Sequence, residues 1–417
     1  MDTVLQIFSK WFSKLSAFDN DVDQFFLMKL PDIVIGLYAE TWEGTRKVLW
    51  RTWQLVYLVM FLHHAFALVH AMQDKDYYDN VIQAYYMLFT YIIVASQIYT
   101  IKSIRKELEI IRGFVNLRKT LRYDERAFKK RARGFRNINM ITLSPILLTI
   151  VMMPLLFVSG TVLTPEYVWN LQLGEGFELL SNGVLVLSVA VLSYVTLVSQ
   201  LCFNFINTLL CGLTTEAEIL GDFFSDLESR VVAAEMNRVG MSVLASKDLR
   251  LNLLSFRNEL KNCVELQQEL LECIRCLKRI TEPLTFILYY MSFFYIAECI
   301  CLGFYGKRSI IDASFMVFAL YYMIQCCIMC YLLERLEDEN QRIAFITYSL
   351  SWPNNLNFSR ENVKLSKEIR AMILFTVQRA NEPLNFSCGG FFPVTMARFG
   401  DMLQMTYALI TLLNTNF

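Results

Sequence analysis

Long uncharged stretches alternate with charge-rich ones along this 417-residue chain. The uncharged stretches are residues 80–101, 137–165, 179–215 and 313–333. Each reaches the roughly 20 residues that an α-helix needs to cross a hydrocarbon core. Three more stretches are apolar with isolated polar residues, so the pattern predicts an all-α polytopic membrane protein with seven transmembrane helices. The predicted spans are about 50–72, 80–101, 138–163, 178–212, 283–306, 312–334 and 394–416, within a single membrane domain that covers residues 1–417.

The Lys and Arg residues are distributed unevenly between alternate loops. Residues 1–51, 102–136, 213–283 and 337–393 carry 34 of them, whereas the intervening loops carry 3. Cytoplasmic loops are enriched in Lys and Arg. We therefore expect a cytoplasmic N-terminus and, after seven spans, an extracellular C-terminus. This topology is the inverse of that of a G-protein-coupled receptor.

The long cytoplasmic segments show helical periodicity of their own. Between residues 249 and 277, apolar side chains recur at steps of three and four, with charged residues on the other face. Residues 336–350 and 363–380 continue this pattern, and Pro353 and Asn354 interrupt it. We expect a cytoplasmic helical layer from about 213–282 and 335–390. Its role is either simple packing or subunit assembly, for which Leu374 and Phe375 are the candidate contacts.

The composition leaves little room for catalytic chemistry. The chain is 55% hydrophobic and 19% charged, against about 25% charged in an average soluble protein. It contains no H-E-x-x-H, P-loop or G-x-S-x-G motif, so we expect no enzyme activity, no catalytic residue, no metal site and no cofactor. Cys273 and Cys276 have C-x-x-C spacing without a second ligand pair, which is typical of reduced cysteines on a helix. A function for Glu298 stays open, because a water-filled vestibule or Lys307 could satisfy an acid near the outer end of its span. A ligand role for His63, His64 and His70 stays open beside snorkelling and hydrogen bonds within the bundle.

Two blocks of sequence resemble the insect odorant receptor family. In residues 330–352 the matching positions are Cys330, Tyr331, Glu334, Ile343, Ala344, Tyr348 and Trp352, while Leu333 and Asn340 stand where the family has Gly and Ser. In the terminal block the matching positions are Gln378, Pro383, Gly389, Gly390, Phe391, Phe392, Phe399, Tyr407 and Leu412. The two blocks cover under a fifth of the chain, and the length and inverted topology also fit.

The resemblance implies a subunit of an odorant-gated, non-selective cation channel in the plasma membrane of the olfactory sensory neuron dendrite. Such channels are heterotetramers of tuning subunits and a shared co-receptor, with a central pore lined by the last helix. Residues 213–282 lack the insertion that lengthens co-receptors, so this chain resembles the tuning kind. The alternative is a seven-helix sensory receptor of inverted topology that signals through a cytoplasmic partner and has no pore. The last helix separates the two hypotheses, since a channel needs that helix to face its symmetry mates.

A small hydrophobic volatile ligand is expected in the outer half of the bundle, between the second, third, fourth and sixth spans. Such ligands bind through apolar and aromatic walls with few polar groups. The candidate positions are Tyr85, Tyr86, Phe89, Met152, Leu155, Ser159, Gly183, Leu187, Phe315, Phe318, Tyr321 and Tyr322. Positions of this kind more often form bundle core than ligand wall, so both interpretations stay open.

The gate is expected near the outer end of the last helix. Alignment of Tyr407 with the near-terminal Tyr of the family places Ile410 at a hydrophobic constriction, and Leu413 and Asn414 follow on roughly the same face. A narrow apolar ring blocks ions by dewetting. Asp401 would attract permeant cations lower on the helix. The alternative is that Ile410 only packs against a neighbouring span.

Overall fold

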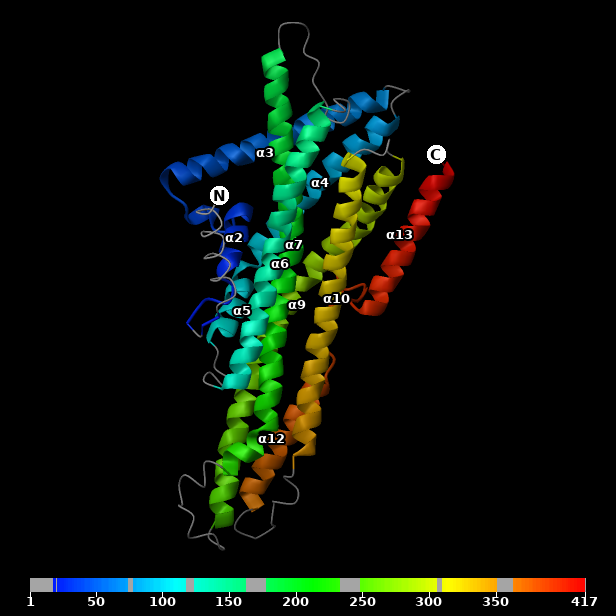
Figure 1. Ribbon diagram of the computed structural model, residues 1–417. Helices are drawn as coiled ribbons and strands as arrows, with labels where there is room; N and C mark the ends of the chain where they lie inside the picture. Colours follow the sequence, from blue (N-terminus) through cyan, green and yellow to red (C-terminus); the bar gives the residue numbers. More distant parts are fainter. Residues whose placement is uncertain are drawn as a thin grey trace, which may run out of the picture.

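In the computed structural model the chain forms an elongated bundle of long helices that run side by side (Figure 1). The structure describes residues 18–19, 21–73, 78–117, 124–162, 178–232, 248–305, 310–350 and 363–416. Seven helices in this part lie at the predicted spans, so the fold class is all-α as predicted. They are α3 (Gly44–Gln73), α4 (Tyr78–Ser103), α6 (Glu125–Val162), α7 (Glu178–Ser225), α9 (Asp248–Tyr305), α10 (Ile310–Ser349) and α13 (Met396–Asn416).

Shorter elements fill the space between these helices. The 3-10 turns η1 (Phe26–Met28) and η2 (Ala39–Thr41) flank α2 (Lys29–Ile35) near the N-terminus. Helix α5 (Arg105–Leu117) follows α4, and α12 (Val363–Asn381) precedes α13. Strands β1 (Ser387–Cys388) and β2 (Phe392–Pro393) form a two-stranded antiparallel hairpin between α12 and α13.

Several helices are much longer than a membrane span. Helices α6, α7, α9 and α10 have 38, 48, 58 and 40 residues. At 1.5 Å per residue, α9 is about 87 Å long, against about 30 Å of hydrocarbon. Helices α7, α9 and α10 are therefore longer than a membrane span requires, and α9 and α10 pack with α12 in the lower part of Figure 1.

Three helices satisfy the membrane-crossing criteria of length and apolar composition within the described residues. They are Glu125–Met152, Val186–Ser225 and Met316–Ser349. These segments belong to α6, α7 and α10, which pack directly against one another in the bundle.

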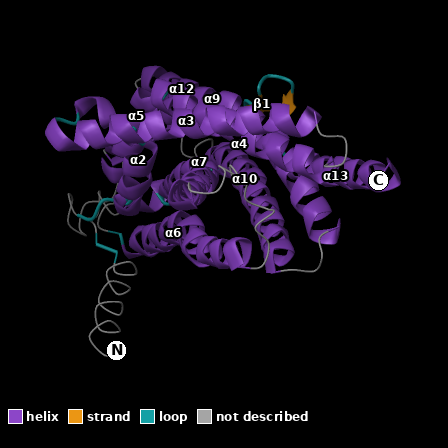
Figure 2. Ribbon diagram, turned by 90° about the horizontal axis from the view of Figure 1, so that it is seen from above, coloured by secondary structure: helices purple, strands orange, loops and turns teal. Residues whose placement is uncertain are grey.

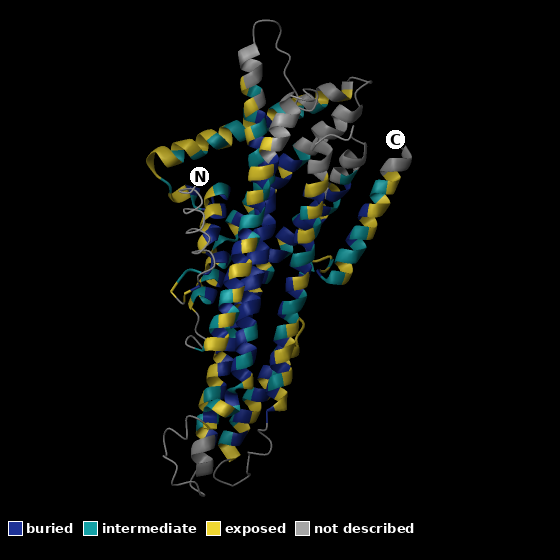
Figure 3. Cartoon of the chain, in the orientation of Figure 1, coloured by how far each residue is buried: buried dark blue, intermediate teal, exposed yellow. Residues whose placement is uncertain are grey.

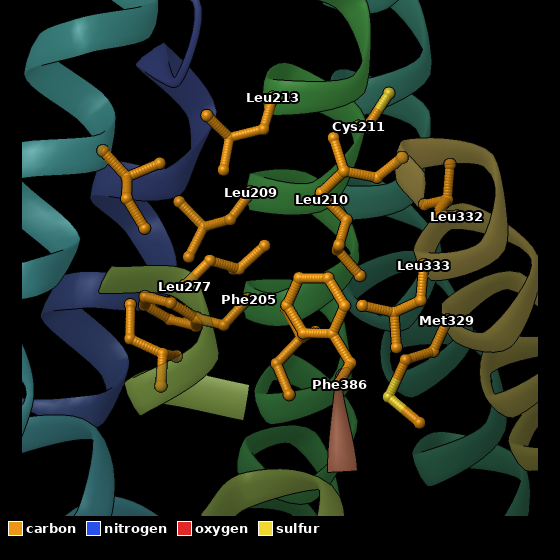
Figure 4. Packing of buried hydrophobic residues seen from close by; sticks show 14 of the residues in the cluster. Phe205, Leu209, Leu210, Cys211, Leu213, Leu277, Met329, Leu332, Leu333 and Phe386 are labelled. Atoms are coloured by element: carbon orange, nitrogen blue, oxygen red, sulfur yellow. The ribbon is translucent and has the colours of Figure 1, made fainter. Parts of the chain in front are cut away.

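Helix α7 forms the centre of the molecule. Buried residues run down its length between α6, α9 and α10 (Figure 3). Figure 4 shows how its apolar side chains meet those of α9, α10 and the segment before β1. The labelled side chains are Phe205, Leu209, Leu210, Cys211 and Leu213 of α7, Leu277 of α9, Met329, Leu332 and Leu333 of α10, and Phe386. Because α7 is surrounded on all sides, its sequence is apolar around the whole helix rather than on one face.

The N-terminal segment 18–41 packs into the bundle rather than lying on its surface. Its apolar side chains Phe25, Met28 and Ile35 are almost fully buried. Asp32 of α2 accepts two hydrogen bonds from the guanidinium of Arg112 in α5, at 2.8 and 3.0 Å. A bidentate pair of this kind fixes both position and orientation. The described residues of this segment thus pack against α5 and α7.

Gly36 ends α2 in a left-handed conformation, with φ +68°. A Cβ atom at this position would overlap the ring of Trp50 in α3. Both the backbone and the close ring therefore require glycine here.

Ion pairs join α6, α7 and α10 at the α12 end of the bundle. Arg131 of α6 binds Glu216 of α7 through two hydrogen bonds of 2.7 and 2.8 Å, and both side chains are buried. Asp222 of α7 lies between Lys130, at 2.6 Å, and Arg342 of α10, at 3.1 Å. The charges of the predicted cytoplasmic layer thus fix the register of three helices.

Candidate ligand site and pore helix

Helices α6, α7 and α10 meet at a set of polar side chains inside the bundle. Tyr322 of α10 donates a hydrogen bond from its hydroxyl to Ser199 Oγ of α7, at 3.3 Å. Its ring also lies 6.1 Å from that of Phe203. On the other side of α7, Thr149 Oγ1 of α6 donates to Gln200 Oε1 at 3.3 Å. The neighbouring residues Ser199 and Gln200 of α7 therefore bind α10, the sixth predicted span, and α6, the third.

Several polar atoms of α7 lack a hydrogen-bond partner within the described part of the chain. Gln200 Nε2 and Ser188 Oγ are buried and make no hydrogen bond there. Ser188 and Ser199 share one face of α7, and Val191 and Val195 lie between them on that face. An apolar wall with hydroxyl groups at both ends suits a small ligand that carries one oxygen function.

The twelve residues predicted to contact ligand differ from one another in how far the structure buries them. Met152, Phe318 and Tyr322 are buried, Leu187 and Tyr321 are half-buried, and Gly183 is exposed. Phe89 of α4 packs with a ring distance of 5.9 Å against Phe294 of α9, which is the fifth predicted span. The side chains of Tyr85, Tyr86, Leu155, Ser159 and Phe315 lie outside the described part of the structure.

Sequence reasoning missed the uncharged polar residues of α6 and α7. Thr149, Ser188, Ser199 and Gln200 are uncharged, so the search for charges and motifs passed over them. A signal was present nonetheless, because a Gln or Ser in the interior of an apolar span requires a hydrogen-bond partner. Listing every polar side chain within the apolar stretches would have identified these four positions.

An aromatic cluster joins α3, α4 and α7. Tyr57 donates from its hydroxyl to the carbonyl of Tyr91 at 2.6 Å, and Trp53 packs edge-on against Tyr194 at 5.2 Å. His64 of α3 bonds the carbonyl of Met60, one turn earlier in its own helix, through Nδ1 at 2.7 Å. This bond lies within α3 and does not link His64 to another helix.

The break before the last helix is a tight hairpin. Cys388 accepts a hydrogen bond from Phe391 N at 3.1 Å, and the two residues between them, Gly389 and Gly390, have φ of +59° and +83°. Two successive positive φ angles are the mark of a type I′ turn, which favours glycine. The Gly-Gly break in the sequence predicted the interruption, while the two short strands were not predicted.

The hairpin is attached to α9 around Pro283. Gly389 N donates to the carbonyl of Glu282 at 3.0 Å. Ser387 Oγ and Glu282 Oε1 lie 3.1 Å apart, and Thr285 Oγ1 donates to the Ser387 carbonyl at 3.3 Å. A Cβ on Gly389 would meet the ring of Phe286 at 2.8 Å. The start of the last helix is therefore held in a fixed place on α9.

Helix α13 then diverges from the bundle. Met402 and Thr406 are buried near its start, whereas Met405, Tyr407 and Leu412 are exposed. Seen from above, α13 lies at the edge of the molecule, on the opposite side from α6 (Figure 2). An apolar helix with so little cover from its own chain needs lipid or other subunits around it.

The predicted gate and vestibule residues of α13 differ in their surroundings. Ile410 is half-buried, and the side chains of Leu413 and Asn414 lie outside the described residues. Asp401 and Arg398 are paired at 2.8 Å, with about half of each side chain exposed. Asp401, predicted to attract cations, is therefore paired with a cation of its own helix.

Helix α12 also leaves apolar residues uncovered. Its buried face consists of Ser366, Ile369, Ile373, Thr376 and Ala380. Leu374 and Phe375 lie on the other side, with 56% and 43% of their surfaces exposed. Arg379 covers one face of the Phe375 ring, with 4.3 Å between the guanidinium carbon and the ring centroid. Both predicted assembly residues are thus available for contact with another subunit.

Comparison with known proteins agrees with this architecture. The family model described as 7tm Odorant receptor matches residues 78–407. Odorant receptor 2a of Drosophila melanogaster is 23% identical over 163 residues, which are 36% of this chain and 38% of that protein. The matched part of that relative is therefore well under half of its length.

Two solved structures share the fold. Both are of the insect olfactory receptor OR5 from Machilis hrabei, one of them in complex with eugenol. The eugenol complex has a TM-score of 0.68 at 11% identity and covers 95% of this chain and 100% of the other. The second structure has a TM-score of 0.66 at 11% identity, with coverage of 94% and 99%. At this identity the likeness establishes the fold.

Proposed function

Because the chain belongs to the 7tm odorant receptor family, we propose that it is the odorant-binding subunit of a ligand-gated, non-selective cation channel. The family is one of membrane-bound sensory receptors and not of enzymes. The proposed ligand is a small hydrophobic volatile molecule. The proposed assembly is a heterotetramer with a co-receptor in the plasma membrane of the dendrite of an olfactory sensory neuron.

The observation that carries the channel function is the position of α13. The helix is attached to α9 and α10 at its start and then leaves the bundle with Met405, Tyr407 and Leu412 exposed. Symmetry-related copies of such a helix, placed around a common axis, would enclose a pore. Ile410, Leu413 and Asn414 would then line its outer end, with Ile410 as the dewetting constriction.

The observation that supports the ligand site is the meeting of α6, α7 and α10. Tyr322, Phe318 and Met152 are buried on these helices, and Gln200 and Ser188 of α7 have buried polar atoms without a partner in the described part of the chain. Hydroxyl and amide groups within an apolar wall would recognise an oxygenated odorant. Eugenol, an oxygenated aromatic molecule, is bound in the OR5 structure, and is therefore a sensible first compound to test on this chain.

Current recording tests the proposal. The chain is expressed in a non-neuronal cell with and without a co-receptor and exposed to a panel of oxygenated and hydrocarbon volatiles. We expect odorant-evoked, non-selective cation current in the presence of the co-receptor. A second-messenger response that persists while no odorant evokes current would instead support a receptor without a pore.

A further inference from the structure

The first turn of α13 is bound by a carboxylate from another helix. Glu334 Oε1 of α10 accepts a hydrogen bond from the backbone N–H of Met396, at 2.7 Å. Met396 is the first residue of α13, and Thr395 Oγ1 accepts the N–H of Arg398 at 3.3 Å. The first N–H groups of a helix have no acceptor within it and carry partial positive charge, so a carboxylate binds there strongly.

We propose that Glu334 is the residue that transmits movement of α10 to the pore helix α13. The proposal rests on the proposed channel function. Glu334 lies twelve residues beyond Tyr322 on the same continuous helix, so about 18 Å separates the candidate ligand site from the contact with α13. A ligand that displaces Tyr322 displaces this part of α10 as well.

The other contacts at the start of α13 come from α9. Tyr289 donates from its hydroxyl to the carbonyl of Arg398 at 2.9 Å, and the hairpin is attached to Glu282 as described above. The first turn of α13 therefore lies between two helices, with α9 on one side and Glu334 of α10 on the other. Relative movement of α9 and α10 must tilt α13.

The length of α13 increases the effect of a small tilt. Ile410 is fourteen residues beyond Met396, or about 21 Å along the helix. A rotation of about 5° at the hairpin moves Ile410 by about 2 Å, given that rise per residue. A displacement of this size is comparable with the radius of a dehydrated cation, so it is enough to open or close a narrow apolar ring.

Two substitutions remove the same hydrogen bond from opposite sides. Glu334→Ala removes the acceptor. Met396→Pro removes the donor without touching α10, and proline is well tolerated at the first position of a helix. Met396→Ala retains the N–H and controls for the lost Met side chain. Glu334→Gln retains an acceptor oxygen, and Asp338→Asn changes an exposed carboxylate one turn further along α10.

The experiment measures odorant-evoked current, surface labelling and co-purification with a co-receptor for each variant. We expect E334A and M396P each to lower the maximal current at saturating odorant by about tenfold, the factor that corresponds to one charge-assisted hydrogen bond. The double variant should be no worse than either single one, because both delete the same contact. M396A and D338N should retain most of the current, and E334Q should lie between them and E334A, because an amide oxygen accepts the bond without the charge.

The outcomes separate the inference from the channel function. If the wild-type pair conducts and E334A carries the same odorant-evoked current, Glu334 does not transmit the movement. The same conclusion follows if the losses of current in E334A and M396P add. Both results leave the channel function intact. Absence of any odorant-evoked current from the wild-type pair overturns the channel function itself. If E334A does not reach the surface, M396P measured against M396A decides the question.

Discussion

At the scale of single residues, the function proposed here depends on a few polar and aromatic side chains within apolar helices. Each must find a partner, because an unpaired polar group in an apolar interior is costly. Tyr322 donates a hydrogen bond to Ser199, and Gln200 Oε1 accepts one from Thr149. Gln200 Nε2 has no partner among the described residues. A ligand can supply what the protein leaves unpaired.

Truncation at the α10 side of this site tests the proposed pocket. We expect Phe318→Ala and Tyr322→Ala each to raise the half-maximal odorant concentration by about tenfold or more, because each loses a large buried contact surface. Ile324→Ala, on the exposed side of the same helix, serves as the control. Dose–response curves that do not change for Phe318 and Tyr322 would place the ligand elsewhere.

The C-x-x-C pair predicts a difference in thiol reactivity. Cys273 is buried, which raises its pKa to about 12, and Cys276 is half-buried, with a pKa also raised by burial. Because the thiolate is the reactive form, both thiols react slowly at pH 7 and faster as the pH rises toward their pKa values. We expect a maleimide to modify Cys276 before Cys273, as measured by mass spectrometry of C273S and C276S variants. Faster modification of Cys273 would mean that α9 is packed differently there.

At the scale of elements, α12 and α13 share one property, which is an apolar surface that their own chain leaves uncovered. For α12 this surface lies in the predicted cytoplasmic layer, where burial from water favours association. For α13 it lies within the predicted membrane span, where lipid provides no such driving force. Assembly should therefore depend on α12 and conduction on α13.

A charge on α12 tests assembly. We expect Leu374→Asp to lower co-purification with the co-receptor by about fivefold or more, because an interface excludes an unpaired charge. Insertion of the chain in the membrane should persist, since Leu374 is exposed in the single subunit. Asn381→Asp adds a charge at the exposed end of the same helix and is the control. Equal yields for L374D and wild type would argue against an α12 interface.

Shortening a side chain on α13 tests conduction. We expect Ile410→Ala to raise the current without odorant by about twofold or more, or to alter ion selectivity, because a wider apolar ring is more easily hydrated. Leu409→Ala, on a different face of the helix, is the control. The co-receptor contributes its own constriction, which limits the size of the effect. If basal current, odorant sensitivity and permeability all stay at wild-type values, Ile410 does not line the pore.

At the scale of the whole molecule, α6, α7 and α10 are longer than a membrane span and are joined near one end by ion pairs. The Arg131–Glu216 pair is the most buried of them, with exposed fractions of 0% and 4%. Pairs of this kind contribute little relative to apolar residues, but breaking one leaves an uncompensated buried charge. The pair therefore holds α6 and α7 in register more than it adds stability.

Removal of one partner tests this interpretation. We expect Glu216→Ala to lower the stability of the detergent-solubilised protein by about 3 kcal/mol, because Arg131 stays buried and charged. Thermal unfolding monitored by a thiol-reactive dye measures the shift in Tm. Lys129→Ala removes the exposed pair with Glu125, which should change little. A similar Tm for both variants would show that Arg131 reaches solvent once Glu216 is lost.

The sequence by itself determined the fold class and the order of the spans. Uncharged stretches of membrane length have one way to satisfy their backbone hydrogen bonds within a single segment, which is the helix. The Gly389–Gly390 break could be placed from the sequence for a similar reason, since two successive positive φ angles favour glycine. The resemblance of residues 330–352 and 378–412 then indicated the family to which the chain belongs.

The tertiary structure decided which side chains meet. Ser199 and Tyr322 are 123 residues apart, and Glu334 and Met396 are 62 apart, so no local pattern records either contact. Helical periodicity gives the face on which a residue lies but not the neighbour of that face, because the neighbour depends on how helices pack. For the same reason the sequence did not indicate that Phe89 packs against Phe294 of α9. The capping of α13 by Glu334 needs both the hairpin and the register of α10, and these exist once the chain has folded.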